Sequence, residues 1–138
     1  MAAVSQVHLI SFDQPRYVKT QRLVVIASQP RTGSRYFAQF LRSTGETSVP
    51  LECFHSAHRK RRVKRCGQYN PLSAFNILCQ LRSTANGVFG VKAHWKQFQL
   101  ACRLRLERNM SNATFIQINR DDVLGQAISL AVATQSGA

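Results

Sequence analysis

The stretch IASQPRTGSRYF, Ile26 to Phe37, decides the fold of this chain. It passes from an apolar run into a turn that holds Arg31, Gly33 and Arg35, and then into a segment with helical spacing. Where a strand turns into a helix, the first N–H groups of the helix have no partner within the helix and can hold an anion. The stretch therefore predicts an anion-binding turn, with an ordinary strand-to-helix connection as the alternative.

The rest of the chain alternates between short apolar runs and segments of helical spacing. Buried strands are expected at Arg22–Ser28, Val88–Ala93 and Ala113–Ile118, because each run is short, apolar and bounded by turn residues. Helices are expected from Ser34, over Leu72–Thr84, from His94 and from Asp121. This alternation predicts a three-layer α/β fold, with a largely parallel sheet and helices on both of its faces.

All four expected helices carry apolar residues at helical spacing, and in the second these are Phe75, Leu78 and Leu81. The residues expected to face the core are Tyr36, Phe37, Phe40 and Leu41 in the first, Trp95, Phe98, Ala101 and Cys102 in the third, and Val123, Ala127 and Leu130 in the last.

Charge narrows the class of ligand. The 138 residues hold 19 Lys and Arg against 6 Asp and Glu, a net charge of +13, which favours polyanions or phosphorylated small molecules. The N-terminus lacks the pattern of a signal peptide, and no stretch approaches the roughly 18 apolar residues of a membrane span. We therefore expect a single cytoplasmic domain over residues 1–138, without a membrane span.

A basic run, HRKRRVKR, occupies residues 58–65. Six of the seven residues from Arg59 to Arg65 are Lys or Arg, so no core could absorb this segment. A solvated loop within the domain is the first interpretation, and a patch that binds polyanions non-specifically is the alternative.

No metal site is expected. The four cysteines are widely spaced and form no C-x-x-C pair, even though His55 and His58 lie near Cys53 in the sequence. Reduced, mostly buried thiols are the expected state.

The turn after the first strand differs from the nucleotide-binding loop of kinases and ATPases. That loop requires the pattern G-x-x-x-x-G-K-[ST], whereas SQPRTGSRY has one glycine and no lysine. A shorter cradle remains, in which Arg31 supplies charge, Thr32 and Ser34 supply hydroxyls, and Gly33 lets the backbone close on a bound group. These groups suit a phosphosulfate.

Three blocks carry a resemblance to a known family: SQPRTGSRYFAQFLRSTG with VPLECFH, then GVFGVKAHWKQ, then INRDDVLGQAIS. In matching order they resemble the bacterial sulfotransferases typified by trehalose 2-sulfotransferase, from about Leu23 to Gln135, with residues 51–86 matching poorly beyond their start. The resemblance implies a P-loop-like α/β sulfotransferase fold and 3′-phosphoadenosine-5′-phosphosulfate as the sulfuryl donor. It also implies a hydroxyl acceptor, on a carbohydrate or glycolipid. Members of the family continue past Ala138, so we expect an incomplete domain.

The resemblance assigns the donor-binding residues. The 5′-phosphosulfate loop matches Gln29, Arg31, Thr32, Gly33 and Ser34, with Pro30 resembling an insertion and Arg35 standing where a hydroxyl residue is usual. The 3′-phosphate site matches Arg120 and Ser129, and arginine suits it because its guanidinium can bind phosphate oxygens in a bidentate way. A plain ion pair of Arg120 with Asp121 or Asp122 is the alternative.

The catalytic residues implied are Glu52, Lys92 and Arg31. Glu52 matches the family's general base, which takes the acceptor's proton, and a helix-capping or salt-bridge role is the alternative. Lys92, which matches a family lysine, and Arg31 would stabilise charge on the leaving phosphate. His94 has no family match, but Lys92 and His94 alternate with Ala93 on one strand and so face the same side.

A rival function is a basic nucleic-acid-binding or assembly protein whose sulfotransferase motifs are vestigial. In that case the run at 58–65 would grip phosphates. The sequence also leaves a homo-oligomer open.

Overall fold

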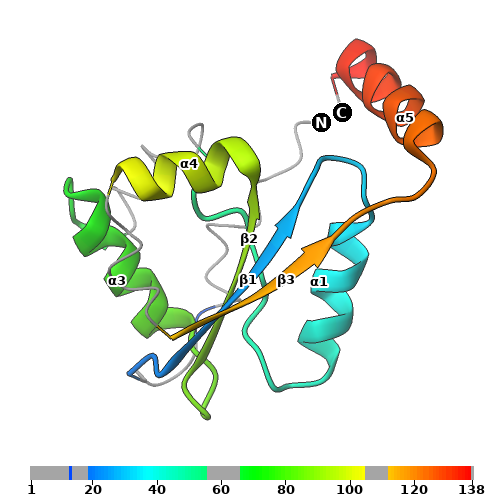
Figure 1. Cartoon of the computed structure of the whole chain (residues 1–138). Helices are drawn as coiled ribbons and strands as arrows, with labels where there is room; N and C mark the ends of the chain where they lie inside the picture. The colour runs from blue at the N-terminus through cyan, green and yellow to red at the C-terminus, as the bar shows by residue number, and fades with distance from the viewer. Residues whose placement is uncertain (1–12, 14–18, 56–65, 105–111, 138) are drawn as a thin grey trace.

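The computed structural model describes residues 13, 19–55, 66–104 and 112–137. The elements are β1 (Arg22–Ser28), α1 (Ser34–Ser43), α3 (Pro71–Arg82), β2 (Val88–His94), α4 (Trp95–Arg103), β3 (Ala113–Ile118) and α5 (Val123–Ser136) (Figure 1). The basic run at 58–65 lies outside the described residues.

β1 is the central strand of the described sheet, with β2 on one side and β3 on the other. Both pairings are parallel; Val25 is opposite Val91 in one and Phe115 in the other. Parallel neighbours need crossover connections, and α3 and α4 lie in those connections. The three predicted strands and the α/β class are confirmed.

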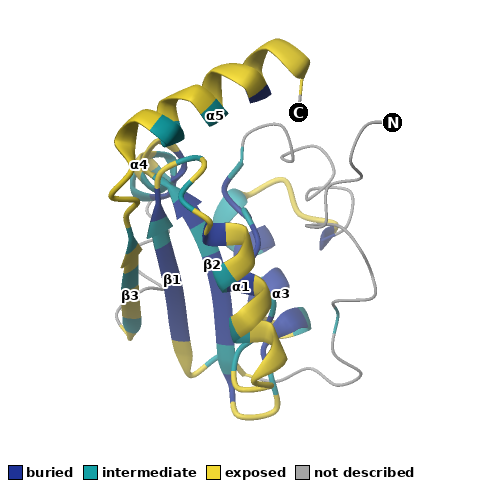
Figure 2. Ribbon diagram, turned by 90° about the vertical axis from the view of Figure 1, so that its right-hand side faces the viewer, coloured by how far each residue is buried: buried dark blue, intermediate teal, exposed yellow. Residues whose placement is uncertain are grey.

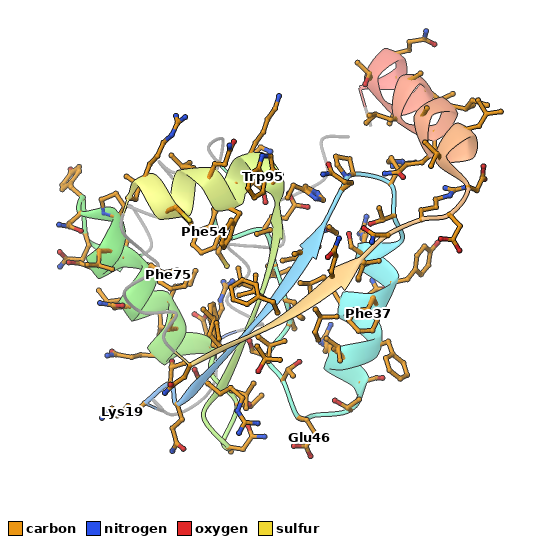
Figure 3. All side chains as sticks on the ribbon, in the orientation of Figure 1. Lys19, Phe37, Glu46, Phe54, Phe75 and Trp95 are labelled. Atoms are coloured by element: carbon orange, nitrogen blue, oxygen red, sulfur yellow. The ribbon has the colours of Figure 1, made fainter. Side chains whose placement is uncertain are left out.

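Helices cover both faces of this sheet (Figure 1). Alternation along β1 turns Leu23 and Val25 toward α3 and α4, where they form one buried core with residues of β2 and both helices. Phe54 and Phe75, labelled in Figure 3, belong to this core, with ring centroids 5.2 Å apart. Val24 and Ile26 point to the other face, which α1 covers.

The segment before Glu52 packs along the outer edge of β2. Leu51 forms a parallel bridge with Val91, and its carbonyl accepts a hydrogen bond from the Lys92 N–H at 3.0 Å. The Gly90 N–H donates to the Ser48 hydroxyl at 2.8 Å. A Cβ atom at Gly90 would lie 2.9 Å from the Pro50 ring, so only glycine admits this close approach. This contact fixes where the chain presents Glu52.

The predicted buried faces of β3 and α5 are wrong. Phe115 on β3 is 53% exposed, and on α5 Val123 is 70% and Leu130 43% exposed, while Ala127 is also exposed. Figure 2 shows α5 as mostly exposed surface. Within the described residues β3 pairs with β1 alone and α5 buries only Ala133, so their apolar pattern has little to pack against.

The predicted buried face of α1 is shifted. Tyr36 and Phe40 are 81% and 63% exposed, whereas Ser34 and Ala38 are buried. The small side chains of Ser34 and Ala38 allow the helix to lie close to the sheet, which leaves Tyr36 outside. On α4, Trp95 is likewise exposed, while Ala101 is buried as predicted.

Candidate active site

The turn between β1 and α1 has the backbone form of an anion cradle. Arg31 and Gly33 have φ values of 65° and 81°, in the left-handed region that glycine enters at little cost. Among the described residues, no side chain caps the N-terminus of α1, and its first turn contains no acidic residue. The N–H groups of that turn therefore suit a negatively charged ligand.

A cavity of about 820 Å³ opens beside this turn. Arg31, Arg35, Lys92 and Arg120 line it, and Glu52 is the single carboxylate among its described lining residues. Such an excess of cationic side chains in a concave site attracts ligands that carry several negative charges.

The structure brings most of the predicted site residues to this one cavity. Its lining includes Glu52, Lys92, His94, Arg31, Gly33, Ser34, Arg120 and Ser129. Gln29 and Thr32 are not among them. The Thr32 hydroxyl donates to the Gln29 carbonyl at 2.9 Å, while Gln29 lines a different pocket.

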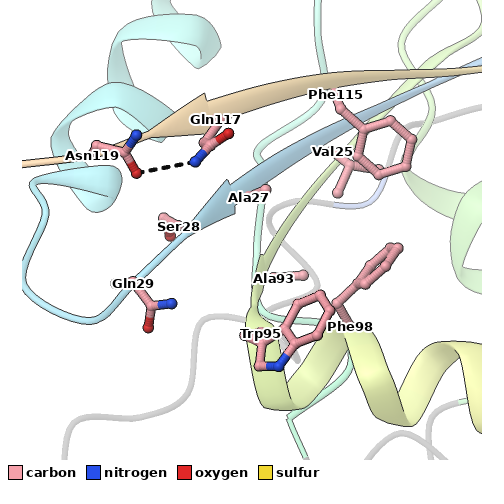
Figure 4. Close-up of a pocket in the computed structure, with 10 residues that line it drawn as sticks. All are labelled: Val25, Ala27, Ser28, Gln29, Ala93, Trp95, Phe98, Phe115, Gln117 and Asn119. Atoms are coloured by element: carbon pink, nitrogen blue, oxygen red, sulfur yellow. Dashed lines mark hydrogen bonds between the residues drawn. The ribbon is translucent and has the colours of Figure 1, made fainter.

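That second pocket, of about 300 Å³, lies against α4 at the ends of the strands (Figure 4). Its walls are the aromatic rings of Trp95, Phe98 and Phe115, and Gln117 donates a hydrogen bond to Asn119 at its edge at 3.2 Å. It shares no lining residue with the cationic cavity.

Glu52 is held at both carboxylate oxygens. The Lys92 ammonium lies 2.8 Å from Oε1 and the His94 Nε2 lies 3.5 Å from the same oxygen, while Gln97 Nε2 donates to Oε2 at 2.8 Å. Burial would raise the pKa of the Glu52 carboxyl, but the hydrogen bonds from these three residues outweigh it and hold the pKa well below its usual range. The carboxylate is therefore ionised. Its contact with Lys92 is the salt bridge that the sequence left open as an alternative role for Glu52.

His94 completes this group. Its Nδ1 lies 2.9 Å from the Ser28 carbonyl, to which it must donate, so its Nε2 can also donate to Glu52 only when the ring carries both protons. The hydrogen bond to Glu52 raises the pKa of His94, against the opposing effect of burial. The sequence prediction that Lys92 and His94 face the same side is confirmed, since both contact Oε1 of Glu52.

α5 meets the turn through polar contacts. Arg31 Nε donates to the Ser129 hydroxyl at 2.8 Å, and Gln126 Nε2 donates to the Pro30 carbonyl at 2.7 Å. Arg120 Nη1 lies 3.5 Å from the Arg31 carbonyl. The two predicted phosphate sites thus lie side by side.

Arg120 also forms the ion pair that the sequence left as an alternative, with Nη2 2.8 Å from Asp122 Oδ2. The other Asp122 oxygen accepts the Gly125 N–H at 2.8 Å and so caps α5. The bond from Gly125, followed by that from Arg120, lowers the pKa of Asp122. Arg120 keeps further N–H groups for a ligand, because a guanidinium has five.

A family model described as Stf0 sulphotransferase matches residues 23–138. The chain belongs to the Stf0 sulphotransferase family. The match confirms the resemblance, and it covers the turn, Glu52, the end of β2 and α5. A search of curated proteins found no match to this chain, and a search of solved structures found none either.

Further observations bear on the other expectations. No helix in the described ranges is long and apolar enough to cross a membrane. Nor does any group of three or more His, Cys, Asp or Glu in those ranges have an arrangement that could hold a metal ion. The four cysteines, all of them described, form no disulfide, and three are buried.

Sequence reasoning missed Gln97 and Gln126. A glutamine on a helix has no motif of its own, and its role depends on which backbone or carboxylate group the fold brings near. For Gln97 one signal was present: it stands three residues after His94 at the start of α4, the spacing of a capping box.

Proposed function

We propose that this protein transfers a sulfuryl group from 3′-phosphoadenosine-5′-phosphosulfate to a hydroxyl of a carbohydrate or glycolipid. The observation that carries the proposal is a cationic cavity in a member of a sulfotransferase family, with Glu52 as the one carboxylate among its described lining residues. The cations suit the donor's phosphates, and the carboxylate suits the proton of an acceptor hydroxyl.

The donor's two anionic ends match two neighbouring parts of the cavity. The 5′-phosphosulfate would lie in the turn, against Arg31, Gly33 and Ser34. The 3′-phosphate would lie at Arg120 and Ser129, which the contacts with Arg31 hold next to the turn. The turn supplies an arginine and the N-terminal N–H groups of α1, and the second position supplies the Arg120 guanidinium, all of them groups that phosphate oxygens prefer.

In the reaction, the acceptor oxygen attacks sulfur, the bond from sulfur to the phosphate oxygen breaks, and the acceptor's proton passes to Glu52. The low pKa of Glu52 makes it a weak base while Lys92 contacts it. Lys92 also lines the cavity, so its ammonium can exchange Glu52 for the leaving phosphate oxygen. That exchange stabilises the developing charge and raises the pKa of Glu52 at the step that needs a base.

Calorimetric titration tests the donor assignment. Adenosine 3′,5′-bisphosphate should bind at least about 10-fold more tightly than 5′-AMP, since charge-assisted hydrogen bonds to the 3′-phosphate contribute about 1.5–3 kcal/mol. Equal affinities would refute the 3′-phosphate site. Transfer is then measured as acceptor-dependent release of adenosine 3′,5′-bisphosphate with a panel of saccharides and glycolipids.

The basic run at 58–65 supports the rival function, and it lies outside the described residues. Replacing residues 59–62 with serine should remove salt-sensitive retention on heparin or DNA and leave nucleotide affinity unchanged, if the run is a separate polyanion-binding loop. A large loss of nucleotide affinity would instead make the run part of the donor site.

A further inference from the structure

The side chains of Lys92, His94 and Gln97, which contact the Glu52 carboxylate, differ in their position relative to the cationic cavity. Lys92 and His94 contact Oε1 and line the cationic cavity. Gln97 contacts Oε2 and is not among the residues that line it. Both partners of Oε1 thus line the cavity, whereas the partner of Oε2 does not.

The amide of Gln97 has a fixed direction. Its Oε1 accepts the His94 N–H at 3.1 Å, which places the acceptor end at the start of α4. Its Nε2 must then point the other way, toward Glu52, and donates at 2.8 Å. The residue is only 8% exposed, so water has little access to either bond.

We propose that Gln97 is a positioning residue for the transfer reaction, which holds Oε2 of Glu52 so that Oε1 faces the acceptor hydroxyl. The inference rests on the proposed function. Gln97 serves this role because it carries no charge: a donor phosphate can attract Lys92 away from Glu52, but it cannot attract a buried neutral amide in the same way. When Lys92 moves, Gln97 and His94 keep the carboxylate in place.

Loss of this bond should alter both geometry and protonation. Within the described part of the chain, the charged groups that contact Glu52 are Lys92 and His94 from β2, and Arg31, Arg35 and Arg120 line the same cavity. From α4, Gln97 is the hydrogen-bond donor to its carboxylate. Without this donor the carboxylate can rotate toward Lys92, and its pKa rises because one hydrogen bond to the charged form is gone.

Two substitutions separate positioning from a merely structural role. Gln97→Leu removes both hydrogen bonds. Gln97→Glu keeps an oxygen that can accept the His94 N–H, and so keeps the cap of α4. In its ionised form it cannot donate to Glu52, and it places a second carboxylate beside it. Gln99→Leu and Gln99→Glu are the matched controls, because Gln99 is exposed on the same helix.

Both Gln97 variants should lower kcat by about 10–100-fold, the cost expected for a misplaced catalytic group, with the KM for the donor within about 3-fold of the parent. The acid limb of the kcat profile should move to higher pH, further for Gln97→Glu than for Gln97→Leu, and the Gln99 variants should show neither change. The proposal would be overturned if Gln97→Glu showed the same kcat and the same pH profile as its control, Gln99→Glu.

Carbon-13 NMR of the Glu52 carboxyl distinguishes failure of this inference from failure of the proposed function. The resonance is assigned from its loss in Glu52→Gln. A parent that neither transfers a sulfuryl group nor binds adenosine 3′,5′-bisphosphate more tightly than 5′-AMP refutes the function, yet the carboxyl titration still measures the contact: the pKa of Glu52 should rise in both Gln97 variants and in neither control. An unchanged titration would overturn the role of Gln97 whether or not the enzyme is active.

Discussion

The two edges of the sheet are stabilised in different ways. On the β2 edge, Leu51 forms a bridge with the strand and Glu52 follows it directly, beside the buried core. On the β3 edge, Phe115 is 53% exposed, and α5 contacts the turn mainly through hydrogen bonds such as that of Gln126 to the Pro30 carbonyl. The catalytic carboxylate proposed here thus depends on packing, and the proposed 3′-phosphate site depends on polar contacts.

This difference predicts that substitutions in the two halves of the site have effects of different size. Glu52, Lys92 and His94 gain their mutual geometry from strand register and burial, so changes nearby should affect chemistry or folding strongly. Arg120 and Ser129 are joined to the turn by a few exposed hydrogen bonds, which are individually weak in water. Changes there should affect ligand binding by modest factors.

The largest effect is expected for Glu52→Gln. Glutamine keeps the shape of the side chain but cannot take up the acceptor's proton, so kcat should fall by about 10²–10⁴-fold. Affinity for adenosine 3′,5′-bisphosphate should persist, because this residue contributes no positive charge to the donor site. Turnover within a few-fold of the parent would make Glu52 structural and His94 the next base to test.

Replacing a phenylalanine with alanine on each of the two strands that flank β1 tests the comparison of the two sheet edges directly. Phe89 on β2 is 1% exposed and Phe115 on β3 is 53% exposed. Phe89→Ala should lower the free energy of unfolding by about 3–5 kcal/mol, the cost of a cavity in a packed core. Phe115→Ala should cost about 1 kcal/mol or less, as surface changes do. Urea denaturation of the pair measures both, and equal losses would show that β3 is as tightly packed as β2.

Much of the fold could be predicted from local pattern. The apolar run Arg22–Ser28 was predicted as a strand from the turn residues that bound it, and its predicted bounds are those of β1. The strand predicted at Val88–Ala93 differs from β2 by His94 alone. The burial of side chains was harder to predict. An apolar pattern indicates that a face could be buried, but it does not show whether another element packs against that face. Phe115, Val123 and Leu130 follow strand or helix spacing and are still exposed.

The site was predictable where chemistry and strand alternation agree. Lys92 and His94 lie two residues apart on one strand, which places them on one face. The glutamate between Leu51 and Cys53 was identified from its family motif. Its contact with Gln97 was not predictable, because it joins two residues 45 positions apart through a bridge of Leu51 to β2 that no local pattern indicates.

Arg120→Ala should reduce the preference for the 3′-phosphate. The variant should bind adenosine 3′,5′-bisphosphate about 10–100-fold more weakly, the range expected for lost charge-assisted hydrogen bonds, and should bind 5′-AMP as the parent does. Calorimetry with the two nucleotides measures the difference. Arg103→Ala serves as the control for lost positive charge, because Arg103 is exposed on α4 and does not line the cavity. An equal loss of affinity for both nucleotides would mean that Arg120 acts through general charge alone.

The smallest effect is expected for Ser129→Ala. Its hydroxyl accepts from Arg31 Nε at 2.8 Å, and this bond connects α5 with the turn. Removing it should weaken nucleotide binding by about 3–10-fold, since one hydrogen bond to a charged group is lost and water can replace part of it at an exposed site. Ser136→Ala is the matched control, because its hydroxyl donates to the Val132 carbonyl within the same helix and Ser136 is not among the residues that line the cavity. If the two variants bind the nucleotide alike, the bond from Arg31 to Ser129 contributes nothing to the site, and the position of α5 must depend on the Gln126 contact with Pro30 and the cap from Asp122.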